Sequence, residues 1–370
     1  MLTDGLILIG MLKSTVIAIY LMATTVATAK AQALFPPPSR TFYDAKHKEE
    51  KSGVKFDGKT IFIQPGVGTP GTINVLGFSR DGKLLAAGKD FGRIVVWDVS
   101  SGDVVRVIES HQKIVSAVAI SPDHRFLASA GSEENPAIAL WNLETGKLQH
   151  AFPVDRPVVQ RLVFAQDGTS LVVTENGTAY VLDTVSGKHT LDVPGERLPA
   201  LSMDGETLIT TNGQKFTIWS TKNWAELKSF PTPAKYAWPL AADVQQDLLI
   251  YGDSTVKQGF IAARINSNLP VLDKRQDLLP QFNPSTGFFA SVAKSKPIVF
   301  GHSGGRIWGW NIDTGKTCIS PILYSESGQL NADGSILVAA IDNGLLSKEK
   351  VEPAVEVWDV PALIQACNLN

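Results

Sequence analysis

A short motif recurs along the chain and limits what the chain can fold into. Each copy is an apolar run that ends in a bulky anchor residue, a polar residue and a turn, as in RIVVWDVSSG (93–102). The anchors recur at intervals of about 40 residues with one double interval, a spacing typical of structural repeats. FIAARINSN (260–268) fills the double interval. The anchor positions are Trp97, Trp141, Leu182, Trp219, Ala263, Trp310 and Trp358.

A second signal accompanies each clear copy, a polar turn that lies upstream of the anchor between two short apolar runs. SRDG (79–82) and NADG (331–334) are examples, and Asp followed by Gly suits a hairpin because Gly accepts a positive φ. The first unit therefore predicts four short antiparallel strands. Because one such sheet cannot cover both of its faces, seven units predict an all-β, seven-bladed β-propeller with four-stranded blades.

The sixth unit allows two strand layouts. Residues 288–310 align without gaps to residues 75–97 of the first unit. Alternatively, FNPSTGFFASV (282–292) supplies the turn and an insertion precedes the anchor strand. The long segment 342–354 of the seventh unit favours the insertion by analogy of length, and both layouts stay open here.

The last unit lacks an outer strand. VEVWDV (355–360) is followed by Pro361 and a short apolar stretch that resembles a one- or two-turn helix. KTIFIQPG (59–66) alternates apolar and polar residues and belongs to no unit of its own. We expect this N-terminal strand to pair with VEVWDV and close the ring, so that the propeller spans residues 60–370.

Residues 1–33 have the pattern of a secretory signal. An apolar run (14–29) follows Lys13, and small residues precede an expected cleavage after Ala33. Met11 is the better initiator, since Asp4 lies where a cation is expected. An uncleaved membrane anchor is the rival interpretation, but the run is shorter than the roughly 20 residues that span a bilayer. We therefore expect export to the periplasm or the medium.

The next segment, 34–59, combines three prolines with a mixed charge run and predicts a flexible arm. A plain spacer is the simpler interpretation of it. Phe42 and Tyr43 make this arm a candidate for partner binding, because aromatic side chains are enriched at binding hot spots.

The W-D/N-x-x-T/S-G units and the S-x-D-G turns together resemble the WD-repeat family over roughly residues 60–360. The resemblance implies a seven-bladed propeller that serves as a binding platform. It also implies a hydrogen-bonded set of His, Ser or Thr, Asp and Trp in each blade. Only the second unit approaches that set, with His111, Ser129 and Trp141, and its turn lacks the Asp.

Catalytic and cofactor chemistry has little support in the sequence. GHSGG (301–305) matches a hydrolase motif, but it joins two strands of a hairpin rather than a strand and a helix, so Ser303 is not expected to be catalytic. The six histidines show no short metal-ligand spacing. We predict no catalytic residue, no cofactor and no metal. The net charge of −2 gives no reason to expect nucleic acid.

Two further sets of residues are candidates for a specific role. Cys318 and Cys367 follow the sixth and seventh anchors, and export would let this even pair form a disulfide. Two buried free thiols are the alternative. Tyr236 and Trp238 lie in the connection into the fifth unit and are candidate partner-binding residues.

These observations predict a protein that is not an enzyme. We expect an interaction scaffold or accessory subunit of an extracytoplasmic complex, with one or more proteins as partners and no membrane span after signal cleavage. The alternative is a propeller enzyme, or a redox accessory subunit, that holds a cofactor or metal at its central channel.

Overall fold

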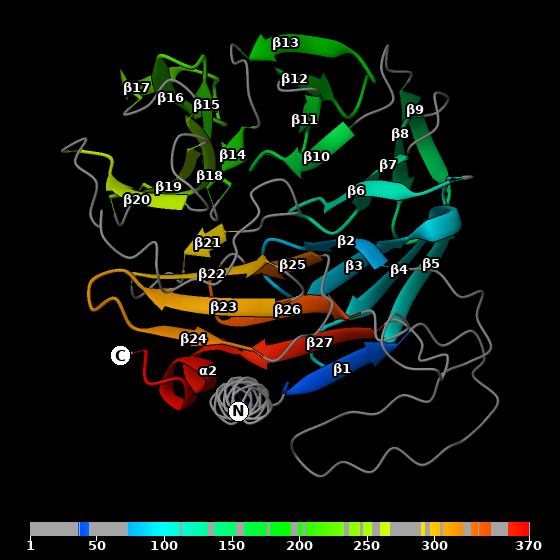
Figure 1. Ribbon diagram of the computed structural model, residues 1–370. Coiled ribbons are helices and arrows are strands. Elements are labelled where there is room, and N and C mark those ends of the chain that lie inside the picture. The colour runs from blue at the N-terminus through cyan, green and yellow to red at the C-terminus, as the bar shows by residue number, and fades with distance from the viewer. Residues whose placement is uncertain are drawn as a thin grey trace, which may run out of the picture.

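A computed structural model describes residues 36, 38–43, 73–111, 113–131, 137–152, 159–175, 178–193, 199–202, 205–232, 237–244, 247–253, 260–266, 290–292, 297–303, 306–320, 327–331, 333–341 and 354–369. Within these residues the chain forms seven antiparallel sheets arranged in a ring (Figure 1). The predicted signal segment (1–33) lies outside the described residues.

The sheets follow one another along the chain and are called blades 1 to 7. Six blades have four strands, and blade 5 has three in the described residues. Blade 1 consists of β2 (Ile73–Phe78), β3 (Leu84–Lys89), β4 (Arg93–Asp98) and β5 (Val104–Glu109). Blade 2 consists of β6 (Val115–Ile120), β7 (Phe126–Gly131), β8 (Ile138–Asn142) and β9 (Leu148–Phe152). Blade 3 consists of β10 (Val159–Phe164), β11 (Ser170–Glu175), β12 (Thr178–Asp183) and β13 (His189–Val193). Blades 4 and 5 consist of β14 (Ala200–Leu201), β15 (Thr207–Thr211), β16 (Lys215–Ser220) and β17 (Glu226–Pro231); and β18 (Ala237–Asp243), β19 (Leu248–Asp253) and β20 (Phe260–Arg264). Blades 6 and 7 consist of β21 (Ala290–Val292), β22 (Ile298–Ser303), β23 (Arg306–Asn311) and β24 (Thr317–Ile319); and β25 (Ser327–Leu330), β26 (Ile336–Ile341), β27 (Ala354–Asp359) and β1 (Arg40–Tyr43).

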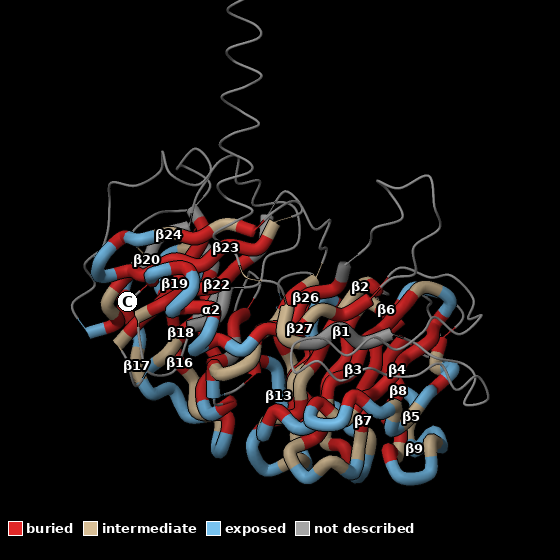
Figure 2. The backbone as a smooth tube through the Cα atoms, turned by 90° about the horizontal axis from the view of Figure 1, so that it is seen from below, coloured by how far each residue is buried: buried red, intermediate tan, exposed pale blue. Residues whose placement is uncertain are grey.

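The first strand of each blade faces the centre of the ring, and the later strands lie progressively farther out (Figure 1). Apolar clusters join neighbouring blades, for example blade 1 to blade 7 and blade 1 to blade 2. Figure 2 shows that burial concentrates in the middle of the blades, whereas the turns along one edge are exposed. Stacking of blade on blade therefore supplies the core that no single sheet has.

The repeated anchors occupy equivalent positions, as the repeat predicts. All seven lie in the third strand of their blades, and each is paired with an aliphatic residue of the second strand. Trp97 pairs with Leu85 and Trp358 with Leu337, and the substituted anchor Ala263 pairs with Leu249. The family-like motif thus marks a fixed register between two buried strands.

The polar residue after the anchor shapes the turn that follows. The Asp98 carboxylate accepts hydrogen bonds from the Ser100 N–H, the Ser100 hydroxyl and the Ser101 N–H. Gly102 closes the turn at φ 76°, a conformation that costs other residues free energy. The hydrogen bond from the Ser100 side chain, with those from the two N–H groups, lowers the pKa of Asp98. The W-D-x-x-S-G pattern thus marks a turn whose own Asp side chain accepts the hydrogen bonds of the residues that follow it.

Cationic side chains tie the outer strands to the next blade. Arg106 of β5 donates from Nε to the Leu143 carbonyl of blade 2 at 2.9 Å. Lys228 of β17 donates from Nζ to the Ile265 carbonyl at 3.0 Å and to the Asn266 side chain of blade 5. Each cation thereby satisfies carbonyl groups in the turn of the neighbouring blade.

An N-terminal strand completes blade 7, as predicted, but a different segment supplies it. β1 pairs antiparallel with β27, placing Thr41 opposite Glu356. Ser39 donates from its hydroxyl to the Val357 carbonyl at 2.8 Å. Because β27 is paired with β26 on one edge and β1 on the other, the predicted pairing of residues 59–66 with this strand is wrong. Those residues lie outside the described part of the chain.

The strands of blade 6 follow the alignment of residues 288–310 with residues 75–97 of the first unit, without gaps. β21 is its innermost strand and pairs with β22, which pairs with β23. The alternative that places an insertion before the anchor strand is therefore wrong. Ser303 pairs with Arg306 across the β22–β23 hairpin, which confirms that GHSGG joins two antiparallel strands.

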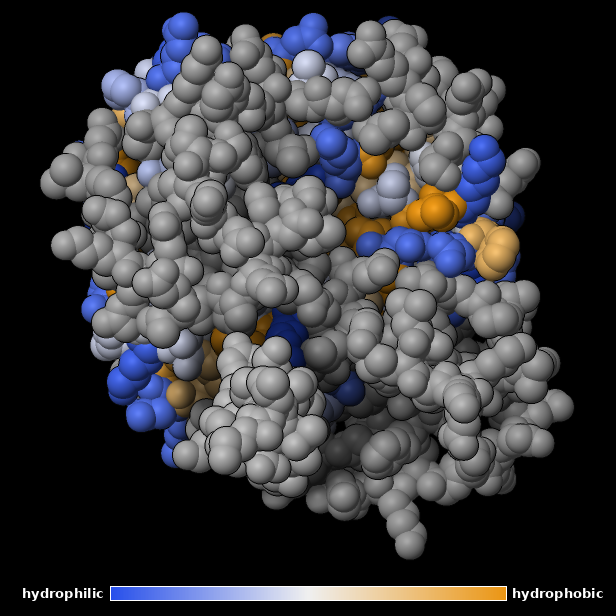
Figure 3. Space-filling model, viewed as in Figure 1, coloured by the Kyte–Doolittle hydropathy of each residue, from blue (hydrophilic) through white to orange (hydrophobic). Residues whose placement is uncertain are grey.

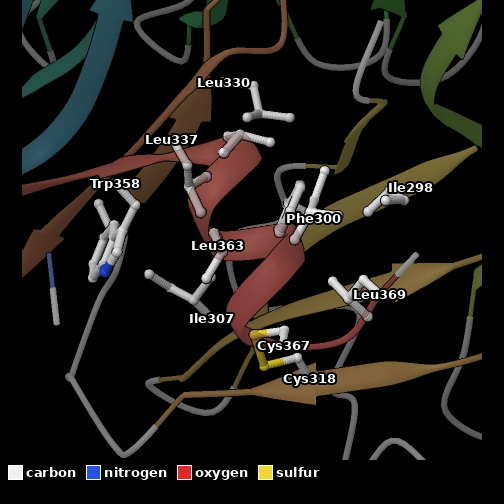
Figure 4. Packing of buried hydrophobic residues seen from close by; sticks show 13 residues of the cluster. Ile298, Phe300, Ile307, Cys318, Leu330, Leu337, Trp358, Leu363, Cys367 and Leu369 are labelled. Atoms are coloured by element: carbon white, nitrogen blue, oxygen red, sulfur yellow. A yellow bond between two sulfur atoms is a disulfide. The ribbon is translucent and has the colours of Figure 1, made fainter. Parts of the chain in front are cut away.

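A short helix ends the described chain, as the sequence after VEVWDV suggests. α2 (Val360–Ala366) has Pro361 in its first turn, and the Asp359 side chain caps it by accepting from the Ala362 N–H at 2.8 Å. Figure 4 shows this helix against a buried cluster shared by blades 6 and 7. Leu363 and Leu369 are buried in that cluster, so the C-terminal segment seals the contact between the two blades.

Candidate interaction surface

Three of the four members of the hydrogen-bonded set that the resemblance implies are joined in blade 2. The His111 Nε2 lies 2.8 Å from the Ser129 hydroxyl, which also accepts from the Trp141 indole N–H at 2.9 Å. All three residues are buried. In blade 4 the Trp219 indole donates to Thr210 in a similar way. In both blades the indole of the third strand is thereby tied to a hydroxyl of the second strand.

Of the four predicted partner-binding residues, the structure describes Trp238, Phe42 and Tyr43, at the level of the backbone. Tyr236 lies outside the described residues, and Trp238 lies within β18 rather than in the connection before it. Phe42 and Tyr43 belong to β1 and are paired with Val355 and Ala354. The prediction that Phe42 and Tyr43 belong to a flexible arm is therefore wrong, because residues 40–43 form a paired strand. That they bind a partner stays a prediction.

The predicted cysteine pair is brought together. The sulfur atoms of Cys318 and Cys367 lie 2.05 Å apart, at disulfide distance, and join β24 of blade 6 to the end of α2 (Figure 4).

The described residues do not meet the requirements of a metal site. In the part of the chain that the structure describes, no group of three or more His, Cys, Asp or Glu side chains could hold a metal ion.

One exposed aromatic residue stands out on the face of the ring that carries the connections between second and third strands. Phe91 lies in a 3-10 turn, η1 (Asp90–Gly92), that joins β3 to β4. Its side chain is 67% exposed, and its backbone has φ 60° and ψ 25°. For a residue with a Cβ, this left-handed conformation costs about 1–2 kcal/mol.

The neighbouring connection holds this turn in place. The Gly92 carbonyl accepts hydrogen bonds from the Ser110 N–H at 2.7 Å and the Ser110 hydroxyl at 2.5 Å. A Cβ added to Gly92 would lie 1.6 Å from the His111 carbonyl oxygen, so only glycine fits there. The backbone on either side of the Phe91 ring is therefore fixed by contacts with blade 2.

A second apolar side chain lies close to this turn. Ile114, directly before β6, is 46% exposed, and η1 contacts β6. Figure 3 shows apolar surface over β6 and η1 with hydrophilic residues around it. Asp90 accepts a hydrogen bond from Asn74 at 2.8 Å, and Lys113 is exposed. The result is a small apolar surface, Phe91 and Ile114, within a polar rim.

The sequence holds a signal for Phe91 outside the repeated motifs. The corresponding connections of blades 3 and 6 carry Asn-Gly and Gly-Gly at 176–177 and 304–305. Tight hairpin turns with positive φ at both central residues favour these pairs. Phe-Gly at 91–92 departs from that preference. The φ of 60° shows that Phe91 nevertheless adopts the left-handed conformation.

The opposite face carries the turns between first and second strands. In blade 2 His124 occupies the position that Gly holds in SRDG, with φ 60°. Its Nε2 lies 2.9 Å from the Asp81 carboxylate of blade 1. Burial alone would raise the pKa of Asp81, but hydrogen bonds from Ser79, a backbone N–H and His124 outweigh it and lower the pKa to about 2.

The fold and its motifs define the class as a β-propeller with seven sheets in the described residues. The family model described as "WD domain, G-beta repeat" matches residues 102–142. This match and the seven repeated anchors support the WD-repeat family, as the sequence predicts.

Curated relatives match over parts of their chains. A retinoblastoma-binding protein 5 homolog of Drosophila melanogaster is 28% identical over 41% of this chain and 32% of its own. A WD repeat-containing protein WDS homolog of Arabidopsis thaliana is 31% identical over 37% and 28%. Eukaryotic translation initiation factor 3 subunit I of Scheffersomyces stipitis is 27% identical over 39% and 41%. In these three matches the chain spans 28% to 41% of the length of the relatives.

Proposed function

We propose that the protein is a non-enzymatic scaffold or accessory subunit that holds one or more proteins in an extracytoplasmic complex. The observation that carries the proposal is the ring itself, a rigid platform closed at blade 7 by β1 and at the blade 6–7 contact by α2. The similarity to WD-repeat relatives supports it. One of these relatives is named as a subunit of a translation initiation factor and another as a binding protein.

Two features support the extracytoplasmic part of the proposal. The sequence pattern of residues 1–33 is that of a secretory signal. Cys318 and Cys367 lie at disulfide distance, and disulfides form and persist in oxidising compartments. The described residues include no helix long and apolar enough to cross a membrane.

One experiment tests export. The protein is produced in its native host, the cells are fractionated, and the exported and cytosolic pools are measured by intact mass. Export predicts a mature chain that begins at Leu34. Full-length protein confined to the cytosol would contradict the proposal.

A second experiment tests the scaffold. Tagged protein is purified from the extracytoplasmic fraction after chemical crosslinking, and co-purified proteins are identified and reconstituted from pure components. We expect at least one stoichiometric complex. A protein that stays monomeric, with no reconstitutable partner, would end the scaffold hypothesis.

A further inference from the structure

We propose that Phe91 is the anchor by which this propeller docks a partner protein, with the phenyl ring entering an apolar pocket of that partner. The inference rests on the proposed scaffold function and names its contact residue. Ile114 forms the second apolar contact, and Asp90 and Lys113 form part of the polar rim.

The backbone of Phe91 adopts a left-handed conformation that favours Gly or Asn. The corresponding connections of blades 3 and 6 carry Asn-Gly and Gly-Gly. Strained backbone of this kind persists where the surrounding structure imposes it, and it concentrates at functional sites. Asn at position 91 would keep the turn with less strain.

The side chain of Phe91 gains little from packing within its own chain. The residue is 67% exposed, so burial of apolar area gives little compensation for the strain. A partner that covers the ring would supply that burial. Exposed aromatic residues that become buried on association are the typical hot spots of protein interfaces.

The turn that presents Phe91 is held in place before any partner binds. Gly92 is fixed against His111 and Ser110, so the backbone of this turn loses little conformational entropy on binding. Preorganisation of this kind raises affinity by lowering the entropic cost of association.

The surroundings indicate a protein rather than a lipid surface. Asp90 flanks the ring, and Glu109 lies nearby, paired with Arg93 at 3.7 Å. Lys113 and Arg93 balance these two carboxylates, so the rim has no excess of cations to attract an anionic membrane. An apolar pair within a mixed polar rim is the usual composition of a protein interface.

The decisive variant is Phe91→Asn in the full chain, because it predicts two effects of opposite sign. Relief of strain should raise the melting temperature by about 1–3 °C. Loss of the anchor should weaken binding of the reconstituted partner at least tenfold, measured by titration with purified components. Val185→Asn is the matched control, since Val185 is 71% exposed in a turn at the opposite face.

The outcomes separate this inference from the proposed function. If the wild type forms a complex and Phe91→Asn binds within twofold of it, the inference is overturned while the scaffold function stands. A melting temperature that falls in Phe91→Asn would refute the strain argument. Vesicles of phosphatidylcholine and phosphatidylglycerol that bind the wild type but not Phe91→Asn would assign the ring to lipid and also overturn the inference. Equal loss of binding in Val185→Asn would show that residue 91 has no special role.

Discussion

Arg80 and Glu206 form an ion pair across the ring, with 3.6 Å between the guanidinium Nη2 and the carboxylate Oε1. Arg80 belongs to the turn between β2 and β3 of blade 1, and Glu206 to the turn between β14 and β15 of blade 4. Blades 1 and 4 are three places apart in the ring, so the pair joins blades that are not neighbours. It lies on the face opposite Phe91, among the turns between first and second strands.

This ion pair should contribute little to stability. Its side chains are 29% and 50% exposed, and water screens such pairs. In a double-mutant cycle of Arg80→Ala and Glu206→Ala we expect a coupling energy below about 1 kcal/mol that falls further in 1 M salt. Urea unfolding of the four proteins measures it. A large, salt-independent coupling would mean that the pair is buried by something else.

Glu356 should make the protein more stable in mild acid than in base. Burial raises the pKa of its carboxyl to about 7 from 4.5. Since the folded-state value is raised, the stabilisation is complete below pH 4.5 and is lost as pH rises to about 7. Glu356→Gln removes the ionisation and should raise stability at pH 8 by up to about 3 kcal/mol. Thermal unfolding between pH 4 and pH 8 measures this.

The matched control for Glu356 is Glu144→Gln, because Glu144 is exposed in the turn between β8 and β9. It should follow the wild-type pH dependence. If Glu356→Gln keeps that dependence as well, another group is responsible for it.

Thr41→Pro should open the ring. Proline removes a backbone N–H from β1, an edge strand of only four residues. We expect a fall in melting temperature of several degrees and increased hydrogen exchange at β27. Ile61→Pro is the comparison, since residues 59–66 contain the segment first expected to close the ring. A larger loss from Ile61→Pro would favour that earlier expectation over β1.

The cysteine pair should stabilise the blade 6–7 contact. A crosslink with a sequence separation of 49 residues contributes about 4 kcal/mol on the chain-entropy account. Unreduced mature protein should show a mass two hydrogens below that of the reduced chain, and Cys318→Ser should unfold at a lower urea concentration. Two free thiols in the exported protein would contradict a structural disulfide.

The repeat made the ring predictable because each anchor is tied to a fixed neighbour, as Trp97 is to Leu85. The closing strand was harder to predict. An edge strand is held mainly by backbone hydrogen bonds, so RTFY (40–43) carries less pattern than the alternating KTIFIQPG (59–66). Phe91 was missed because side-chain exposure and the backbone angle φ are properties of the fold, and Phe-Gly at 91–92 alone does not reveal them. The sixth blade was ambiguous because β21 has only three residues.

The closure of blade 7 also sets an order of events during synthesis. Ser39 and Val357, whose contact helps to seat β1, are 318 positions apart. At translation rates of about 5–20 residues per second, β1 leaves the ribosome roughly 15–60 s before its partner strand exists. Throughout that interval the growing chain has an unpaired strand at its beginning, a form in which chains aggregate. A chaperone or the export machinery that occupied this strand until β27 arrived would protect the nascent protein.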